Sequence, residues 1–342
     1  MDVRMKATWK KYASLLHQAA EPAYQENHTR TIWEQFCAEF GLPLQFYVNG
    51  KVPVIQLGNP DTADFHLAFT ADLDAVWDDS TKQFAHLCGH DIQSLHAFQL
   101  AYHYQTGRFP QDMALSIMGS PGEECLPAML DQVNSFLPGK KQMMDAGLFQ
   151  QIDMVLSTHV ADHLPTRTFL DVRQVDGLLW FVHLSESRDL AWHDTVRQVS
   201  SHIFQTSLLA LTFHDRTCQV KIRYVPYFDD ELACQQLQIE LERCGIEMNI
   251  LAYYPPYTQS ETLRKYFHQT VKDSGQKMIT SPRLPGYTDL GYPAKRLPVM
   301  QLYVGGTTNQ THATHFEVTD PDFTYFAPIE VILSMLHKRR GQ

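Results

Sequence analysis

The chain has 342 residues, 44% of them hydrophobic and 19% charged, which is typical of a globular protein with room for two domains. Its formal net charge is −10 and its only Lys/Arg-rich run is the short one at 338–340, which argues against nucleic acid as a partner. No apolar run reaches membrane-spanning length and no signal-peptide core follows Met1, so we expect no membrane partner. Six scattered cysteines do not form the pattern of a disulfide framework, which predicts free thiols and a cytoplasmic location.

The spacing of apolar residues divides the chain into predicted helices and strands. Residues 6–40 show helical spacing that ends at Gly41, and Asn49-Gly50 between two alternating runs predicts a hairpin. From residue 65 onward, short apolar strands alternate with helices. This pattern predicts an α/β fold built on a largely parallel sheet.

Reactive side chains follow four of the predicted strands, close to the point where each strand ends. In a parallel sheet the active site lies outside the carboxyl ends of the strands, so we expect these side chains to converge. They are Asp72 and Asp74 after the strand at 65–70, Glu123 and Glu124 after 113–118, His159 after 154–157, and His312 after 299–304.

The segment 86–91 adds further candidate metal ligands. Cys88 and His90 flank Gly89, which permits a tight backbone turn, and thiolate and imidazole are both good zinc ligands. With the strand-end residues, five candidate ligands suit two divalent ions that share a hydroxide: Cys88, His90, Glu124, His159 and His312. Glu123, beside a ligand carboxylate, has the position of a general base. Three carboxylates are predicted to orient the imidazoles from behind: Asp72, Asp74 and Asp91.

Each of these residues also has a simpler interpretation. Glu123-Glu124 is typical of a solvated helix start, because acidic side chains favour the first turn. A single histidine is most often a packing or surface residue, and a buried cysteine is most often a small hydrophobic residue. We assign five residues to these classes: His86, His96, His163, His315 and Cys125. Cys88 is also a candidate nucleophile for a thiol enzyme with a single metal.

The middle of the chain predicts a second structural unit. Residues 176–254 predict the order strand, helix, strand, helix, strand, with the helices at 194–211 and 230–244. None of the candidate ligands falls inside this stretch. We therefore predict a discontinuous metal-binding catalytic domain over 1–170 and 256–342, and an inserted domain over 171–255.

The motifs, taken in order, resemble those of the M20 metallopeptidases. The closest resemblance is to the amidohydrolase branch of that family, which contains N-acyl-amino-acid amidohydrolases, hippurate hydrolases and auxin-conjugate hydrolases. It spans about residues 70–320, and its most specific motifs are Cys88-Gly89-His90-Asp91 and Glu123-Glu124. The other matching segments are 71–75, 121–124, 158–160, 254–256, 286–290 and 312–317.

The resemblance implies a zinc-peptidase-like catalytic domain with a largely parallel mixed sheet. It also implies an inserted α+β lid domain that often forms a homodimer. Members of the family hydrolyse an amide bond with one or two divalent metals, so two ions of zinc, manganese or cobalt are the expected cofactors. Motif matching assigns the five ligands named above and makes Glu123 the base.

The chain departs from the family pattern at several places. Gln93 stands where the family usually has histidine, and Gly122 replaces the alanine of Pro-Ala-Glu-Glu. The family's Ser-Glu-Asp-Phe segment appears as 287–290, and its acidic second residue is lost. The lid segment Gly-Gly-His-Ala, whose histidine stabilises the reacting carbonyl, has no clean match. The candidate substrate-binding residues are His193, Arg188 and Asp289.

Two functions follow from these observations. The first is a cytoplasmic, metal-dependent hydrolase that cleaves the amide bond of a small N-acyl amino acid or short peptide, with metal-activated water and Glu123 as general base. The second is a non-catalytic metal-binding or ligand-binding homologue that has lost the lid histidine.

Overall fold

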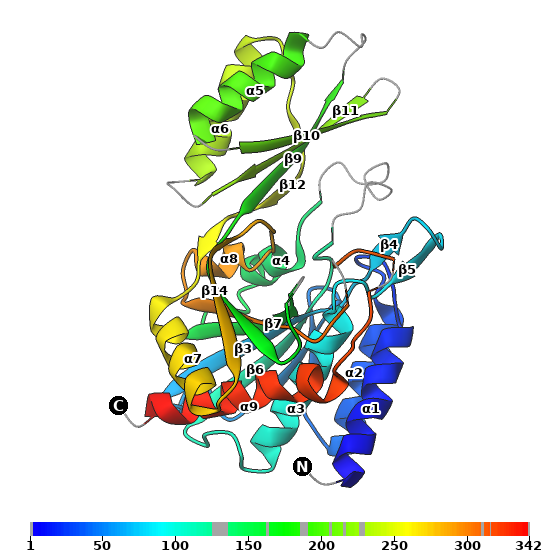
Figure 1. Cartoon of the computed structure of the whole chain (residues 1–342), viewed down its shortest axis with the longest axis vertical. Helices are drawn as coiled ribbons and strands as arrows, with labels where there is room; N and C mark the ends of the chain where they lie inside the picture. Colours follow the sequence, from blue (N-terminus) through cyan, green and yellow to red (C-terminus); the bar gives the residue numbers. More distant parts are fainter. Residues whose placement is uncertain are drawn as a thin grey trace.

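The computed structural model describes residues 3–124, 136–161, 164–184, 191–204, 207–214, 217–225, 230–308, 311–314 and 316–340. These residues form a nine-stranded sheet, a four-stranded sheet and a two-stranded hairpin. Figure 1 shows the large sheet among helices in the lower part of the molecule, and the four-stranded sheet with its two helices above it.

The large sheet is mixed, with parallel strands at its centre. The strand order is β1-β2-β6-β3-β7-β15-β8-β13, and β14 also pairs with β8. Strands β6, β3, β7 and β15 are parallel to one another, whereas β2 and β8 are antiparallel to their inner neighbours. The bounds are β1 Leu44–Tyr47, β2 Val52–Leu57, β3 Phe65–Asp72, β6 Met113–Ser120, β7 Met154–Val160, β8 Thr168–Val175, β13 Tyr257–Thr258, β14 Lys277–Leu284 and β15 Val299–Val304. The predicted fold class, α/β with a largely parallel mixed sheet, is confirmed.

Helices cover both faces of this sheet and form two apolar cores. One core joins the sheet to α1 Val3–Gln18, α2 Asn27–Phe40, α3 His90–Gln105, α7 Glu261–Asp273 and α9 Pro321–Arg340. The other core involves α4 Gly139–Asp145 and the short α8 Gly291–Ala294. In the first core the rings of Phe36 and Phe98 stack with centroids 4.1 Å apart, and both side chains are fully buried. Burying each such ring contributes about 1.5–3 kcal/mol.

The helical region predicted at 6–40 consists of two helices joined by a connector at residues 19–26. Pro22 interrupts the run because it has no backbone N–H to donate. The carboxylate of Glu21 accepts the N–H groups of His28 and Thr29 at 3.0 Å each, and so supplies partners at the start of α2. One continuous helix is therefore excluded by the chemistry of the connector.

The four-stranded sheet differs from the prediction in one element. Its order is β10-β11-β9-β12, with two helices, and the bounds are β9 Gly177–Leu184, α5 Ala191–Phe204, β10 Ser207–His214, β11 Thr217–Tyr224, α6 Asp230–Arg243 and β12 Asn249–Tyr254. The helix predicted at 194–211 is wrong in its second part, because residues 207–214 pair antiparallel with β11 over eight positions. Pairing with a distant strand has prevailed over local helix propensity.

The hairpin predicted at Asn49-Gly50 is confirmed. Strands β1 and β2 pair across a turn in which Asn49 and Gly50 have φ of 56° and 81°, as the hairpin signal predicts. Helix α7 begins after Ser260, whose side chain accepts the N–H of Leu263. A small hairpin, β4 Val76–Asp78 with β5 Gln83–Ala85, precedes the segment 86–91. Among the described helices, none is long and apolar enough to cross a membrane.

Candidate metal centre

The carboxyl ends of four adjacent parallel strands place the predicted residues at one edge of the large sheet. Strands β6, β3, β7 and β15 are neighbours in that order, and Asp72 pairs in register with Ser120 while Val160 pairs with Val304. The strands therefore end at similar heights. Their C-terminal extensions carry Glu123, Glu124 and His312 to the same edge, and His159 is the second-to-last residue of β7.

The turn between Cys88 and His90 requires glycine for two separate reasons. Gly89 has φ of 86°, the left-handed conformation that glycine adopts without strain. A Cβ atom at this position would lie 2.8 Å from Cγ2 of Val160. The turn opens helix α3, so Cys88 lies just before the helix and His90 is its first residue. Both side chains are buried.

Five side chains form two overlapping groups of candidate ligands. The ligand atoms of Cys88, Glu124 and His312 all lie within 4.8 Å of one another, as do those of His90, Glu123 and Glu124. His312 Nε2 is 3.1 Å from Glu124 Oε1. Thiolate, imidazole and carboxylate are the ligand types that zinc prefers, so these donors fit a divalent metal. Glu124 belongs to both groups and therefore lies between two adjacent sets of ligands.

His159 lies next to these groups without belonging to either. Its ring centroid is 5.8 Å from that of His90, and its Nδ1 is 2.7 Å from the carbonyl oxygen of Val160. A carbonyl can only accept, so Nδ1 carries the hydrogen and Nε2 keeps its lone pair for a ligand. The tautomer is thus the one that metal binding through Nε2 requires.

The three predicted supporting carboxylates have different partners. Asp74 contacts the candidate ligands directly: its carbonyl oxygen accepts from His90 Nδ1 at 2.9 Å, and its carboxylate accepts the N–H of Glu124 at 2.8 Å. Asp91 instead lies 2.8 Å from Nδ1 of His17. The carboxylate of Asp72 accepts a hydrogen bond from the ammonium group of Lys140. Of the three, Asp74 is the one that orients a candidate imidazole.

A buried lysine that the sequence motifs do not indicate lies close to the candidate centre. Lys140, the second residue of α4, is fully buried, and its ammonium group binds the carboxylates of Asp72 and Asp289, the latter at 2.5 Å. Its backbone N–H also donates to Asp289 at 2.8 Å. Burial lowers the pKa of Lys140, but the two carboxylates outweigh burial and raise it above its usual value. Asp289, predicted to bind substrate, is therefore half of an internal ion pair.

The two neighbouring glutamates titrate in opposite directions. Burial raises the pKa of Glu123 well above its usual value, and the charge of Glu124 raises it further. Burial also acts to raise the pKa of Glu124, but His312 and His90 outweigh it and lower that pKa to about 2. One carboxylate is poised to take up a proton while its neighbour stays ionised. This division is typical of a base beside a ligand.

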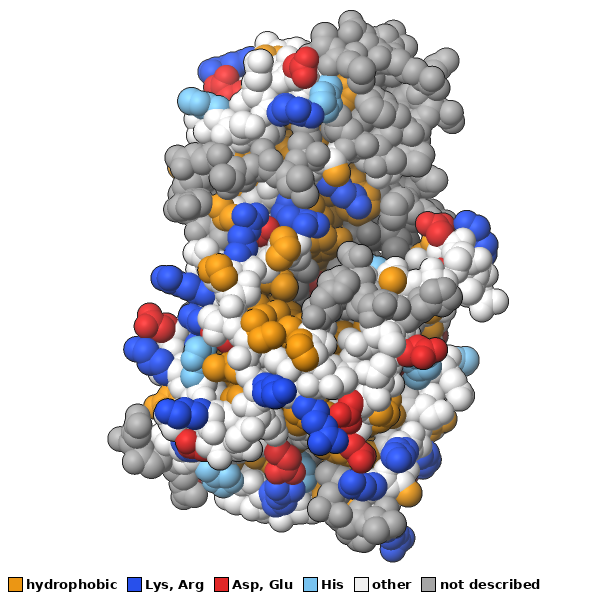
Figure 2. Space-filling view, in the orientation of Figure 1, with side chains coloured by type: hydrophobic (Ala, Val, Ile, Leu, Met, Phe, Trp, Pro, Cys, Tyr) orange, Lys and Arg blue, Asp and Glu red, His pale blue; other side chains and the backbone are white. Residues whose placement is uncertain are grey.

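A cavity of about 450 Å³ opens beside the candidate ligands. Its described lining includes Glu123, Glu124, His159 and His312, together with Arg223 from β11, whose guanidinium donates to the carbonyl of Pro285. Segment 284–288 and apolar side chains complete the wall. Figure 2 shows hydrophobic side chains gathered on this face of the molecule, between the four-stranded sheet and the helices below.

Of the two remaining substrate-binding candidates, His193 is among the described residues and Arg188 is not. His193 lies on α5, with its Nδ1 3.6 Å from Oδ1 of Asp194, and it is absent from the described residues that line the cavity. Arg188 lies outside the described residues, as do Cys125, His163 and His315. His96, predicted as a packing residue, is fully buried between Thr158 and Thr324.

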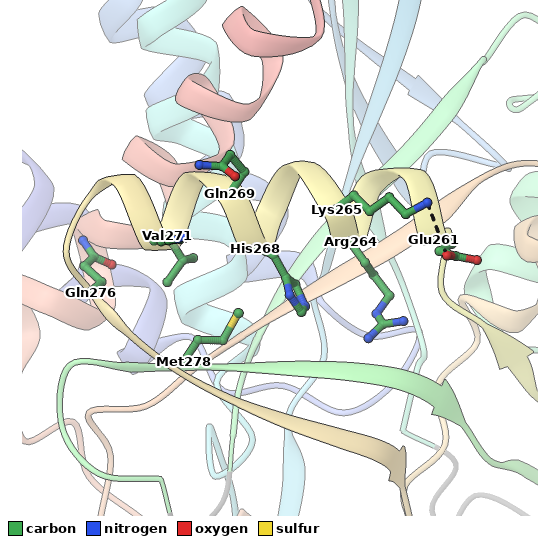
Figure 3. A pocket seen from close by; sticks show the side chains of 9 residues that line it. Glu261, Arg264, Lys265, His268, Gln269, Val271, Gln276 and Met278 are labelled. Carbon is green, nitrogen blue, oxygen red and sulfur yellow. Dashed lines mark ion pairs between the residues drawn. The ribbon is translucent and has the colours of Figure 1, made fainter.

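A second cavity, of about 670 Å³, lies between α7 and β14. Arg264 and His268 point into it in Figure 3. Both are bound to the buried carboxylate of Asp171, Arg264 Nε at 2.7 Å and His268 Nε2 at 2.7 Å. Its described lining contains none of the predicted ligands, so its size does not make it the reactive site.

Comparison with known proteins gives a consistent result. The model of peptidase family M20/M25/M40 matches residues 68–336. The solved YXEP protein of Bacillus subtilis, described as a dinuclear metal-binding peptidase of the M20 family, has 13% identity and a TM-score of 0.69 over 97% of this chain and 98% of that chain. An aminohydrolase of methicillin-resistant Staphylococcus aureus has 15% identity and a TM-score of 0.70, covering 97% and 96%. An aminobenzoyl-glutamate utilization protein of Klebsiella pneumoniae has 11% identity and a TM-score of 0.62, covering 98% and 96%. No curated protein matches the sequence significantly.

Proposed function

Because the chain belongs to peptidase family M20/M25/M40 and is a metal-dependent hydrolase, we propose that it cleaves the amide bond of a small N-acyl amino acid or short peptide. We further propose the amidohydrolase branch of the family, on the motifs that the sequence shares with it. The observation that carries the proposal is the pairing of Glu123, with its raised pKa, and the ionised Glu124 beside Cys88 and His312.

The proposed centre contains two divalent ions, and zinc is the metal that best suits its thiolate, imidazole and carboxylate ligands. They would be held by Cys88, His90, Glu124, His159 and His312. When bound, such ions polarise the substrate carbonyl and make the attacking water more acidic. Burial raises the pKa of Cys88 to about 12, so the thiol is protonated in the metal-free protein, and coordination to a cation would favour the thiolate.

Glu123 has the position and chemistry of the proton carrier. Its Oε2 atom lies 4.0 Å from Nε2 of His90, within the group that also contains Glu124, and the residue lines the cavity. The hydroxyl of Tyr254 donates to the backbone carbonyl of Glu123 at 2.6 Å, which fixes the main chain at this residue. We propose that the carboxylate takes a proton from the attacking water and passes it to the leaving amine.

The cavity supports a small, partly apolar substrate with a negative group. Its volume of about 450 Å³ is in the range of small-molecule sites. Apolar side chains such as Leu170 and Leu284 suit an acyl group, and the guanidinium of Arg223 suits a carboxylate. An N-acyl amino acid combines both features.

Two adjacent variants test the proposal. Glu123→Gln should lower kcat at least 10³-fold and leave two metal ions per chain, because it removes the base and keeps the ligands. Glu124→Gln should instead lose metal. The assay uses a panel of N-acetyl amino acids and dipeptides with added Zn²⁺, Mn²⁺ or Co²⁺, with metal content measured by elemental analysis. Full activity in Glu123→Gln would show that another group is the base.

A non-catalytic homologue is the second candidate function. It is favoured by the place of His193, which is absent from the described lining of the cavity and so does not replace the lid histidine there. Two metals per chain with no turnover of any amide in the panel would support this alternative.

The organisation of the protein is also a proposal. We propose that residues 171–255 form an inserted lid domain on a catalytic domain of 1–170 and 256–342, and that the lid joins two copies into a homodimer. We also propose a cytoplasmic location. Light scattering of the purified chain and of a variant lacking residues 177–254 would test whether the four-stranded sheet carries the dimer contact.

A further inference from the structure

The connector at residues 19–26, between α1 and α2, contacts three segments of the candidate metal centre. It lies outside the 68–336 span that matches the family model. The carbonyl of Glu21 accepts the N–H of Ala75 at 2.8 Å, in the segment that follows β3. Further contacts reach the segments before the ligand turn and before the glutamate pair: His86 Nε2 lies 3.4 Å from the carbonyl of Ala19, and Gly122 donates its N–H to Glu26.

Glu26 makes the most direct of these contacts. Its side chain is fully buried, and one carboxylate oxygen accepts both the N–H of Gly122 at 2.9 Å and the N–H of Tyr24 at 2.7 Å. Arg30 lies 3.5 Å from the other oxygen. Because buried backbone N–H groups need an acceptor, this single oxygen holds both N–H groups in fixed directions. Glu26 therefore ties the connector to the residue that immediately precedes Glu123.

Tyr24 packs against the same glycine. A Cβ atom on Gly122 would lie 2.6 Å from Cζ of Tyr24, and Gly122 has φ of 58°. The aromatic ring thus occupies the space that an alanine would need. The Tyr24 hydroxyl donates to the carbonyl of Leu137 and accepts from Gln142 at 2.8 Å, so the tyrosine also joins the glycine to α4.

We propose that Glu26 and Tyr24 are positioning residues that fix the backbone at Gly122 and so aim Glu123 and Glu124. Glu26 sets the direction of the Gly122 N–H, and the Tyr24 ring closes the space beside it. This inference rests on the proposed roles of the two glutamates. Displacement of a catalytic group by about 1 Å can cost about 10²-fold in rate, so a small change at Gly122 is expected to have a large effect.

Substitutions in the connector test the proposal against a matched control. Glu26→Ala should lower kcat 10-fold to 100-fold with KM changed less than threefold, and should speed the loss of metal to a chelator at least tenfold. Glu26→Gln, which keeps an acceptor oxygen, should recover most of the rate. Glu21→Ala is the control, because that carboxylate also accepts two backbone N–H groups but those of α2. It should lower thermal stability and leave kcat unchanged.

The two readouts separate this inference from the proposed function. Thermal melts identify the temperature range in which each variant is folded, and all rates are measured below it. Wild-type kcat and wild-type metal retention in folded Glu26→Ala would overturn the positioning role, as would an equal fall of kcat in Glu21→Ala. If the wild-type protein hydrolyses no amide, the proposed function fails, and the chelator rates still decide whether Glu26 positions the ligand Glu124.

Discussion

Replacing Lys140 by methionine is expected to destabilise the protein by about 3–5 kcal/mol, because two buried carboxylates would lose their cation. The side chains of Lys140 and Asp289 are 0% exposed and that of Asp72 is 2% exposed. Water therefore cannot replace the ammonium group. Methionine has a similar length and no charge, so the loss reports the charge and its hydrogen bonds rather than a cavity.

The loss of stability in Lys140→Met, relative to the wild type, should grow with pH. Burial raises the pKa of Asp289 to about 6, and Lys140 counteracts part of that rise. Without Lys140 the pKa rises further, so the carboxyl group binds a proton when the chain folds near neutral pH. A carboxyl group whose pKa is raised on folding lowers the stability of the folded protein as pH increases above the unfolded pKa of about 3.9. Lys140→Met should therefore be closest to wild type at pH 5 and furthest from it at pH 8.

Urea unfolding of the metal-free protein, followed by tryptophan fluorescence from pH 5 to pH 8, measures this effect. The neighbouring Lys141 is a matched control: its ion pair with Asp145 is on the surface, with side chains 35% and 55% exposed. Lys141→Met should cost about 0.3–0.5 kcal/mol. The double variant Lys140→Met, Asp289→Asn should recover more than half of the loss. A deficit below about 1 kcal/mol for Lys140→Met, within the range of an ordinary substitution, would refute the reasoning.

Further predictions concern acid stability, the metal and the turn before α3. Burial lowers the pKa of His96 to about 4, so only the unfolded chain binds the extra proton between pH 7 and pH 5, and the free energy of unfolding should fall by about 2 kcal/mol over that range. In urea unfolding of His96→Gln, the free energy of unfolding should depend less on pH. The same pH dependence as in the wild type would contradict this reasoning. Cys88→Ser should lose at least one metal ion by elemental analysis; full metal content with loss of activity would instead favour a cysteine nucleophile. In urea unfolding, Gly89→Ala should lower the free energy of unfolding by at least about 2 kcal/mol more than Gly107→Ala does. Both glycines have positive φ, but a Cβ at Gly89 would meet Val160, whereas nothing lies within 4 Å of a Cβ at Gly107. Equal losses would show that backbone strain alone is responsible.

The candidate site could be predicted where its residues depend on local pattern and on the geometry of a parallel sheet. Glu124 and His312 are far apart in sequence, yet each follows an apolar strand, and parallel neighbours end at the same edge. Glycine at position 89 indicated a tight turn, and the structure gives it φ of 86°. The helix predicted at 230–244 corresponds to α6, Asp230–Arg243, because its apolar period is local to the sequence.

Features that depend on partners distant in sequence could not be predicted. Lys140 is 149 residues from Asp289, and nothing in its surroundings in the sequence distinguishes it from Lys141, which is on the surface. The bond from Gly122 to Glu26 spans 96 residues. Residues 207–214 have local features compatible with a helix, and only the pairing with β11 selects the strand. In each case the deciding energy comes from tertiary contact.

Two departures from the family pattern have structural partners that preserve the site. Gln93, which stands in place of the usual histidine, accepts the backbone N–H of Asp72 at 2.9 Å with its side-chain oxygen. Gly122, which stands in place of alanine, leaves the space that the ring of Tyr24 fills. Each altered residue thus keeps a contact next to the candidate centre, so the departure that bears most on substrate is the missing lid histidine, and the search for substrate contacts belongs at the cavity wall rather than at the candidate ligands.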